Sequence, residues 1–157
     1  MNTDTKITAL DVAAYFLHKA DADDAGDLIS NLKLQKLLYY AQGSFLAVQK
    51  QPLFEDEIQA WFHGPVVPAV YDVYKQHKDQ PILAPSEYDV SFSKFNDEQL
   101  ELLEEVYTVF AQYSAWRLRD MTHQETPWQE HERNVYNKPT ITNTSIQRYF
   151  ETHLLNE

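Results

Sequence analysis

The sequence predicts a mainly α protein: a single compact helical domain with a small β element, spanning residues 1–157. Apolar residues recur at spacings of three and four in several capped segments, which is typical of amphipathic helices. Aromatic residues make up 13% of the chain against three glycines, which favours large side chains packed between helices over a turn-rich β design. One short stretch alternates apolar and polar residues, as a half-buried strand does.

The first two predicted helices are separated by an acidic run. The first begins at Thr8 and Asp11, which form a capping pair. The second begins at Ser30 or Asn31 and is the predicted central core helix. Gly43 within it indicates a close contact with another helix, because glycine otherwise costs up to about 1 kcal/mol there. Polar residues of this helix outside its apolar stripe are expected in solvent: Lys33, Lys36 and Gln42.

A short strand and a rigid turn follow. Ile58, Ala60 and Phe62 alternate with more polar neighbours, so these three side chains are expected on the buried face. Residues 63–68 then form a turn, and its second proline suits the first turn of a further helix. Residues 81–95 hold a brief alternation that would either pair with this strand or form an ordered loop.

The longest predicted helix begins at Asn96, with Gln99 completing a capping box, and ends near Met121. Arg117 falls on its apolar side, where the guanidinium would pair with a buried carboxylate or reach solvent. A second row has residues seven apart: Leu102, Val109 and Trp116. This row is core if another helix covers it, and otherwise a partner surface with an acidic rim. A closing helix is predicted after Thr142.

Composition limits the classes of partner. Thirteen basic and twenty-four acidic residues give a net charge of -11, which repels phosphate backbones and anionic lipid. We therefore expect no direct nucleic-acid or membrane partner, whereas a basic protein would be attracted. Solubility alone also explains this charge. The absence of cysteine and of any apolar run near 18 residues favours a cytoplasmic protein.

No catalytic or metal-binding motif is recognisable. His63, His123, Glu125 and His131 are candidate ligands or acid-base groups, but their spacing matches no specific metal or nucleophile pattern. Structural roles explain them better: His63 would hydrogen-bond the turn backbone, and Thr122 with Glu125 would form a capping box. We expect no enzyme, no cofactor and no metal.

Several motifs in one order resemble a known family. They are SNLKLQKLLYYAQG at 30–43, the strand and turn at 60–66, and THQETPW at 122–128. Together they are similar to the Panacea, or SocA-like, antitoxin domain family, which includes the phage-associated GepA group. His63 is not diagnostic. The motif residues, whose family role is expected to be mainly structural, are Leu34, Gln35, Lys36, Leu37, Tyr39, Trp61, Gly64, Pro65, Val66, Tyr71, Thr122, His123, Glu125, Pro127 and Trp128.

The resemblance implies the antitoxin of a bacterial or prophage toxin-antitoxin system, which neutralises a cognate protein toxin by direct binding. It would act either by blocking the toxin or as a proteolytic adaptor that delivers it to a cellular protease. The alternative is a phage or mobile-element protein that binds a host factor, with no toxin. Toxin contacts would lie on variable surfaces, and the candidate contact is the row of Leu102, Val109 and Trp116.

Overall fold

The structure, a computed structural model, describes residues 6–22, 28–82 and 92–154. Helices dominate it, so the predicted mainly α class with a small β element is confirmed. The elements in chain order are α1 (Ala9–Ala22), β1 (Ile29–Ser30), α2 (Asn31–Gln49), β2 (Ile58–Trp61), β3 (Gly64–Val66), α3 (Pro68–Tyr74), η1 (Lys75–His77), β4 (Pro81–Ile82), η2 (Phe92–Lys94), α4 (Asp97–Phe110), α5 (Ala115–His123), α6 (Thr126–Gln129), η3 (Glu132–Asn137), β5 (Thr140–Ile141) and α7 (Asn143–Leu154).

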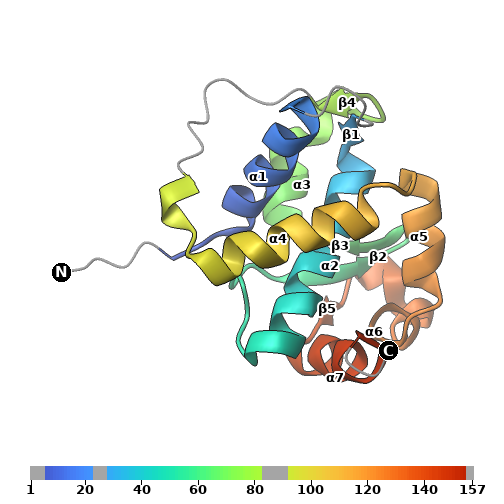
Figure 1. Cartoon of the computed structure of the whole chain (residues 1–157). Helices are drawn as coiled ribbons and strands as arrows, with labels where there is room; N and C mark the ends of the chain where they lie inside the picture. Colours follow the sequence, from blue (N-terminus) through green and yellow to red (C-terminus); the bar gives the residue numbers. More distant parts are fainter. Residues whose placement is uncertain (1–5, 23–27, 83–91, 155–157) are drawn as a thin grey trace.

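Helix α2 is the axis around which the other elements pack. It contacts α1, α3, α4, α5, α7 and strand β3, and Figure 1 shows α4 crossing it while α7 lies along its lower end. Its side chains at residues 33–47 are all buried. A helix surrounded in this way has no solvent-facing side. The expectation that Lys33, Lys36 and Gln42 face solvent is therefore wrong.

The described β structure consists of two small antiparallel groups. Strand β2 lies between β3 and β5, and β1 pairs with β4. The β2–β3 register places Trp61 opposite Gly64, so Phe62 and His63 form the hairpin turn. Ile58 and Ala60 face the core as predicted, but Phe62 is exposed because the strand ends one residue earlier than its alternation indicates.

The predicted helix starts are confirmed. Thr8 and Asp11 exchange hydrogen bonds before α1, and the Ser30 hydroxyl accepts from a backbone N–H of α2. Asn96 and Gln99 form the capping box of α4. Short side chains that pair with free backbone N–H groups are strong local signals, which explains why these boundaries could be read from sequence.

The predicted long helix from Asn96 to Met121 is two helices. Helix α4 ends at Phe110, and α5 begins after Ser114, whose hydroxyl accepts a hydrogen bond from the Arg117 N–H at 3.0 Å. The buried Lys33 ammonium donates to the Ala111 carbonyl at 2.6 Å, so the end of α4 receives a positive partner. Arg117 is exposed, which is the second of the two outcomes expected for it, and it lies on α5 rather than on the apolar side of one long helix.

Gly43 allows α7 to lie against α2. A Cβ at this position would lie 2.4 Å from the Phe150 ring, which is too close for any side chain. The predicted close helix contact is confirmed. The weak alternation expected within residues 81–95 falls mostly on 83–91, outside the described residues, and Pro81–Ile82 pair with β1 rather than with β2.

Candidate functional site

Amide side chains of α2 hold the backbone of neighbouring segments. The Gln42 Oε1 accepts from the N–H groups of Leu53 and Phe54 at 2.8 and 3.2 Å, and its Nε2 donates to the Phe54 carbonyl at 2.8 Å. The Gln35 Oε1 accepts from the Val67 N–H at 2.9 Å. Buried backbone groups in irregular segments need such partners. These side chains thus fix the segments before β2 and α3.

Lys36 is fully buried at a crowded corner between α2, β3 and α5. Its Nζ donates to the Pro65 carbonyl at 3.1 Å. Gly64 has φ +112, and a Cβ there would lie 2.7 Å from the Lys36 Cε and 2.8 Å from the Thr122 Oγ1. Glycine is therefore required for both conformation and space. Burial, and then the nearby Arg119 guanidinium, lower the pKa of Lys36 to about 7.

Glu125 joins the α5–α6 corner to α2. Its two carboxylate oxygens accept hydrogen bonds from the Tyr39 and Tyr40 hydroxyls at 2.9 and 2.7 Å. Burial raises the pKa of Glu125 to about 7, against the opposite effect of these two hydrogen bonds. The predicted capping box with Thr122 is wrong, because the Thr122 hydroxyl donates to the Arg119 carbonyl within α5.

The remaining motif aromatics link the sheet to α3 and α6. The Trp128 indole N–H donates to the Trp61 carbonyl at 2.8 Å, and the His123 ring stacks on Trp128 with centroids 3.8 Å apart. Tyr71 packs edge-on against Trp61 with ring centroids 4.8 Å apart, and the Lys138 ammonium lies 4.1 Å from the Trp61 ring centroid. Burial lowers the pKa of His123 to about 4. Its ring therefore packs as a neutral aromatic group at neutral pH.

A group of side chains, here called the aromatic cluster, consists of the exposed Phe62, His63 and Trp116 and the half-buried Arg119. The His63 ring lies 5.2 Å from Phe62 and 5.5 Å from Trp116. The Arg119 Nε donates to His63 Nδ1 at 2.9 Å, and its guanidinium lies 4.7 Å from the Trp116 ring centroid. His63 was predicted to hydrogen-bond the turn backbone, but it pairs with the Arg119 side chain instead. Phe62 and Trp116 remain 60% and 55% exposed.

A pocket of about 490 Å³, here called the α2–α3 pocket, adjoins the aromatic cluster. Phe62 and His63 belong to both. Lys75, Lys78 and Asp79 stand at the segment after α3. Motif residues from α2, β2, β3 and α3 line the rest: Gln35, Lys36, Trp61, Val66 and Tyr71.

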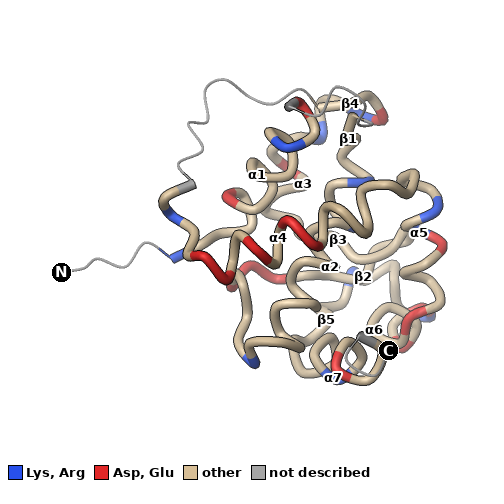
Figure 2. Tube along the Cα trace, viewed as in Figure 1, with Lys and Arg blue, Asp and Glu red and all other residues tan. Residues whose placement is uncertain are grey.

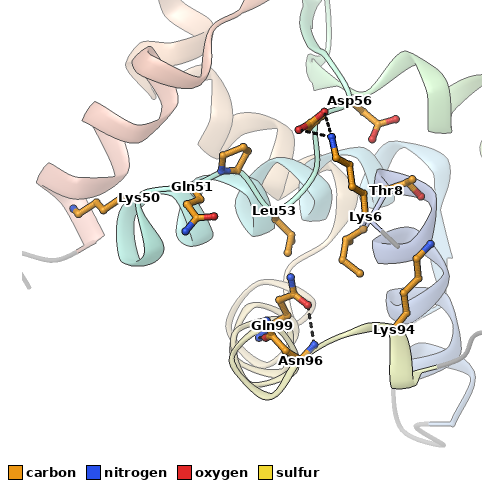
Figure 3. Close-up of a pocket in the computed structure, with 12 residues that line it drawn as sticks. Lys6, Thr8, Lys50, Gln51, Leu53, Asp56, Lys94, Asn96 and Gln99 are labelled. Atoms are coloured by element: carbon orange, nitrogen blue, oxygen red, sulfur yellow. Dashed lines mark hydrogen bonds and ion pairs between the residues drawn. The ribbon is translucent and has the colours of Figure 1, made fainter. Parts of the chain in front are cut away.

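A second hollow, of about 610 Å³, lies where α1 and α4 begin and α2 ends (Figure 3). Its polar side chains already have partners within the protein. Lys6 pairs with Glu55 at 3.2 Å, Asp56 accepts from a backbone N–H of α1, and Asn96 and Gln99 are held in their capping box. These partners make the hollow a junction of helix ends rather than a prepared binding site.

Comparison with known proteins shows a family match over the segment that holds most of the motif residues. The family model described as the antitoxin SocA-like, Panacea domain matches residues 34–129. This chain belongs to that family. The antitoxin SocA of Caulobacter vibrioides (strain NA1000 / CB15N) is 43% identical over 77 residues, which are 49% of this chain and 40% of that protein. No solved structure matches the chain.

In this Panacea domain the candidate contact row is not continuous. Leu102 is buried in the core, whereas Val109 and Trp116 are 46% and 55% exposed. The break between α4 and α5 separates Trp116 from the other two residues, so a seven-residue spacing no longer places them on one side. The inclusion of Leu102 is therefore wrong.

Sequence reasoning missed the exposure of Phe62 and the contact of Arg119 with His63 in this Panacea domain. The signal for Phe62 was Gly64, because a glycine at positive φ two residues after Phe62 indicates that the strand ends at Trp61. No sequence signal places Arg119 beside His63, since the two residues meet only through the packing of α5 on the hairpin.

The acidic residues of the domain gather along α4, where Figure 2 shows successive acidic positions; Glu98, Glu101 and Glu105 are exposed there. Within residues 6–22, 28–82 and 92–154, no three histidine, aspartate or glutamate side chains gather closely enough to hold a metal ion. Among the helices of the same segments, none has the length and apolar character needed to cross a bilayer.

Proposed function

We propose that this chain is an antitoxin: a single Panacea domain, spanning residues 1–157, that neutralises a cognate protein toxin by binding it directly. Family membership and the SocA relative support the antitoxin role, although the match spans about two-fifths of that relative's length. The observation that carries the binding role is the aromatic cluster. Two large apolar side chains, Phe62 and Trp116, lie exposed on either side of His63, and Arg119 bonds His63 and lies over the Trp116 ring, an arrangement typical of interface hot spots.

The proposed toxin contact includes Phe62, His63 and Trp116, and it replaces the row predicted from sequence. Tryptophan and arginine are enriched at interface centres because they combine large apolar area with fixed polar groups. The exposed carboxylates of α4 would attract a basic region of the toxin during approach.

A binding role without catalysis is supported by the partners of the candidate acid-base groups. Both Glu125 oxygens accept tyrosine hydroxyls, the His123 ring is stacked on Trp128, and His63 accepts from Arg119. A general base needs a hydrogen-bonding position open toward substrate. Both oxygens of Glu125 and one ring nitrogen of His63 are occupied by partners within the protein.

The test is co-expression of this chain with the product of the neighbouring gene. We expect that product to arrest growth alone and to become harmless with the chain, with the two proteins co-purifying. The antitoxin role is contradicted if the product is harmless alone or remains equally toxic. Recovery of a host factor in a pull-down, without any toxic neighbour, would support the phage or mobile-element alternative.

Blocking and proteolytic delivery are distinguished by the lifetime of the toxin. A blocking antitoxin leaves the toxin level unchanged, whereas an adaptor shortens the toxin's half-life in cells that contain the protease. Pulse-chase measurements in strains with and without each major cytoplasmic protease separate the two mechanisms. The direct contact proposed here is required by both.

A further inference from the structure

The α2–α3 pocket has a charge opposite to that of the molecule. The chain carries a net charge of -11, yet three lysines and one aspartate line this pocket. Lys75 and Lys78 are exposed at the rim, and Lys36 is the buried lysine among the lining residues. Lys75 is 3.7 Å from Asp72, but exposed pairs of this kind contribute little. The pocket is thus a local cationic site within an acidic protein.

Lys36 has unused capacity for an anion. Among the described residues, the Pro65 carbonyl is the hydrogen-bond acceptor that its Nζ reaches, whereas an ammonium has three donors. Its side chain is completely buried, so water does not compete freely for the remaining donors. A buried cation without a counter-charge favours an approaching carboxylate more strongly than a surface lysine does.

The walls of the pocket are apolar and already ordered. Trp61 is held by the hydrogen bond from its indole N–H to the Gln59 side chain and by edge-on packing against Tyr71. Phe62 and His63 continue this wall into the aromatic cluster. Ordered aromatic walls beside a few charged groups are typical of sites that bind a bulky side chain and fix its orientation.

We propose that the α2–α3 pocket binds an acidic segment of a partner protein, with one bulky apolar side chain against Trp61 and Tyr71 and a carboxylate directed at Lys36, Lys75 and Lys78. The inference rests on the proposed function in one respect, because it takes that partner to be the toxin. The acidic α4 and the cationic pocket then recognise regions of opposite charge on the same toxin, which fixes its orientation.

The probe is a blocked hexapeptide with one phenylalanine between aspartates, titrated into the ¹⁵N-labelled chain. Two peptides are controls: one replaces the aspartates with asparagines, and the other replaces phenylalanine with alanine. We expect the acidic peptide to shift the Trp61 indole and Val66 amide signals and each control to bind at least about tenfold more weakly. Equal binding of the asparagine peptide, or shifts confined to other surfaces, would overturn the inference.

Lysine variants distinguish binding in the pocket from non-specific electrostatic attraction of the peptide to the protein surface. Lys36→Met and Lys75→Met should each weaken the acidic peptide, by roughly tenfold and threefold, since charge-assisted contacts are lost. Methionine is close in volume to lysine, but Lys36→Met leaves the Pro65 carbonyl without this partner, so the melting temperature of the variant is measured beside its peptide affinity. Lys50→Met is the matched control, because Lys50 pairs with Glu151 at the other end of α2. Equal weakening by Lys50→Met would contradict a specific site.

Binding should also depend on pH through Lys36. Arg119 and His123 face it from α5 and His63 from the hairpin turn, and Lys75, Lys78 and Asp79 stand at the rim. The lowered pKa of Lys36, about 7, means that its ammonium is lost between pH 6.5 and 8.5. The acidic peptide should therefore bind about tenfold more weakly at pH 8.5, and Lys36→Met should abolish this dependence. The same pH slope in Lys36→Met would exclude Lys36 from the site.

The two proposals fail in different ways. If the acidic peptide binds the pocket but the neighbouring gene product is not neutralised, the site stands and the antitoxin role fails. If a Lys36→Met, Lys75→Met double variant loses peptide binding yet neutralises the toxin fully, the toxin does not use the pocket. That second outcome overturns this inference and leaves the antitoxin role intact.

Discussion

The polar interior around α2 and the aromatic cluster are built from similar side chains but differ in burial. In the interior, Tyr39 and Tyr40 bond Glu125, and Trp128 is covered by His123. In the cluster, Trp116 is covered on one side by Arg119 and otherwise remains in solvent. The interior therefore stabilises the fold, whereas the cluster retains apolar area that a partner can bury.

The contrast between the buried interior and the exposed cluster also explains where the family motifs lie. Gln35, Lys36, Gln42 and Glu125 each bond a group on a different element, so replacing one leaves a buried polar group unpaired. Phe62 and Trp116 have no such obligation to the fold. A family whose motifs occupy the interior can thus vary the surface without losing its architecture.

The largest difference in stability is expected between replacing the buried Trp128 and replacing the exposed Trp116. Trp128→Ala should lower the free energy of unfolding by about 3–5 kcal/mol, because it opens a cavity under His123 and removes the hydrogen bond to Trp61. Trp116→Ala, the matched exposed change, should alter it by less than about 0.5 kcal/mol. Urea denaturation followed by circular dichroism measures both. Similar losses in the two variants would show that the cluster is part of the core.

The stability of Glu125→Gln relative to the wild type should rise with pH. Burial raises the folded-state pKa of Glu125 to about 7 from 4.5, so folding opposes its ionisation. Wild-type stability relative to the variant should be highest below pH 4.5 and fall, by on the order of 3 kcal/mol, up to pH 7. Urea denaturation at several pH values measures this difference. A difference independent of pH would mean that Glu125 is not buried as described.

Gly43→Ala should destabilise the protein by roughly 1–3 kcal/mol, since the added methyl meets the Phe150 ring. Combining it with Phe150→Leu tests this cause directly. The double variant should lose less than the sum of the two single losses, because the smaller side chain gives the methyl room. Thermal denaturation of the four proteins in this cycle gives the coupling. Additive losses would indicate that another contact limits position 43.

Much of this architecture could be predicted because it depends on local signals. The caps at Ser30 and Asn96, the helix contact at Gly43 and the short strand at Ile58 each follow from a residue and its near neighbours. The break after Phe110 was missed, although Ser114 is a local cap signal for the start of α5. The contact of Lys33 with the Ala111 carbonyl at the end of α4 is tertiary and could not be read from the sequence.

The same reason explains the errors at the candidate site. Lys33, Lys36 and Gln42 were expected in solvent because polarity is usually read as exposure, whereas here each bonds the backbone of another segment. The aromatic cluster depends on the hairpin turn meeting α5, so periodicity along one helix could not find it. Sequence therefore indicates which residues belong to the family more readily than which surface binds.

The most direct test of the account measures toxin affinity and stability together for two double variants. Phe62→Ser with Trp116→Asp removes the aromatic cluster, and the aspartate lies in the first turn of α5, where a negative charge is favourable. Leu28→Ser with Val48→Asp is the control, since these exposed apolar residues lie outside the aromatic cluster. We predict at least about a 100-fold loss of affinity for the first variant at an unchanged melting temperature, and no loss for the control. Unchanged toxin affinity in the first variant would contradict the account.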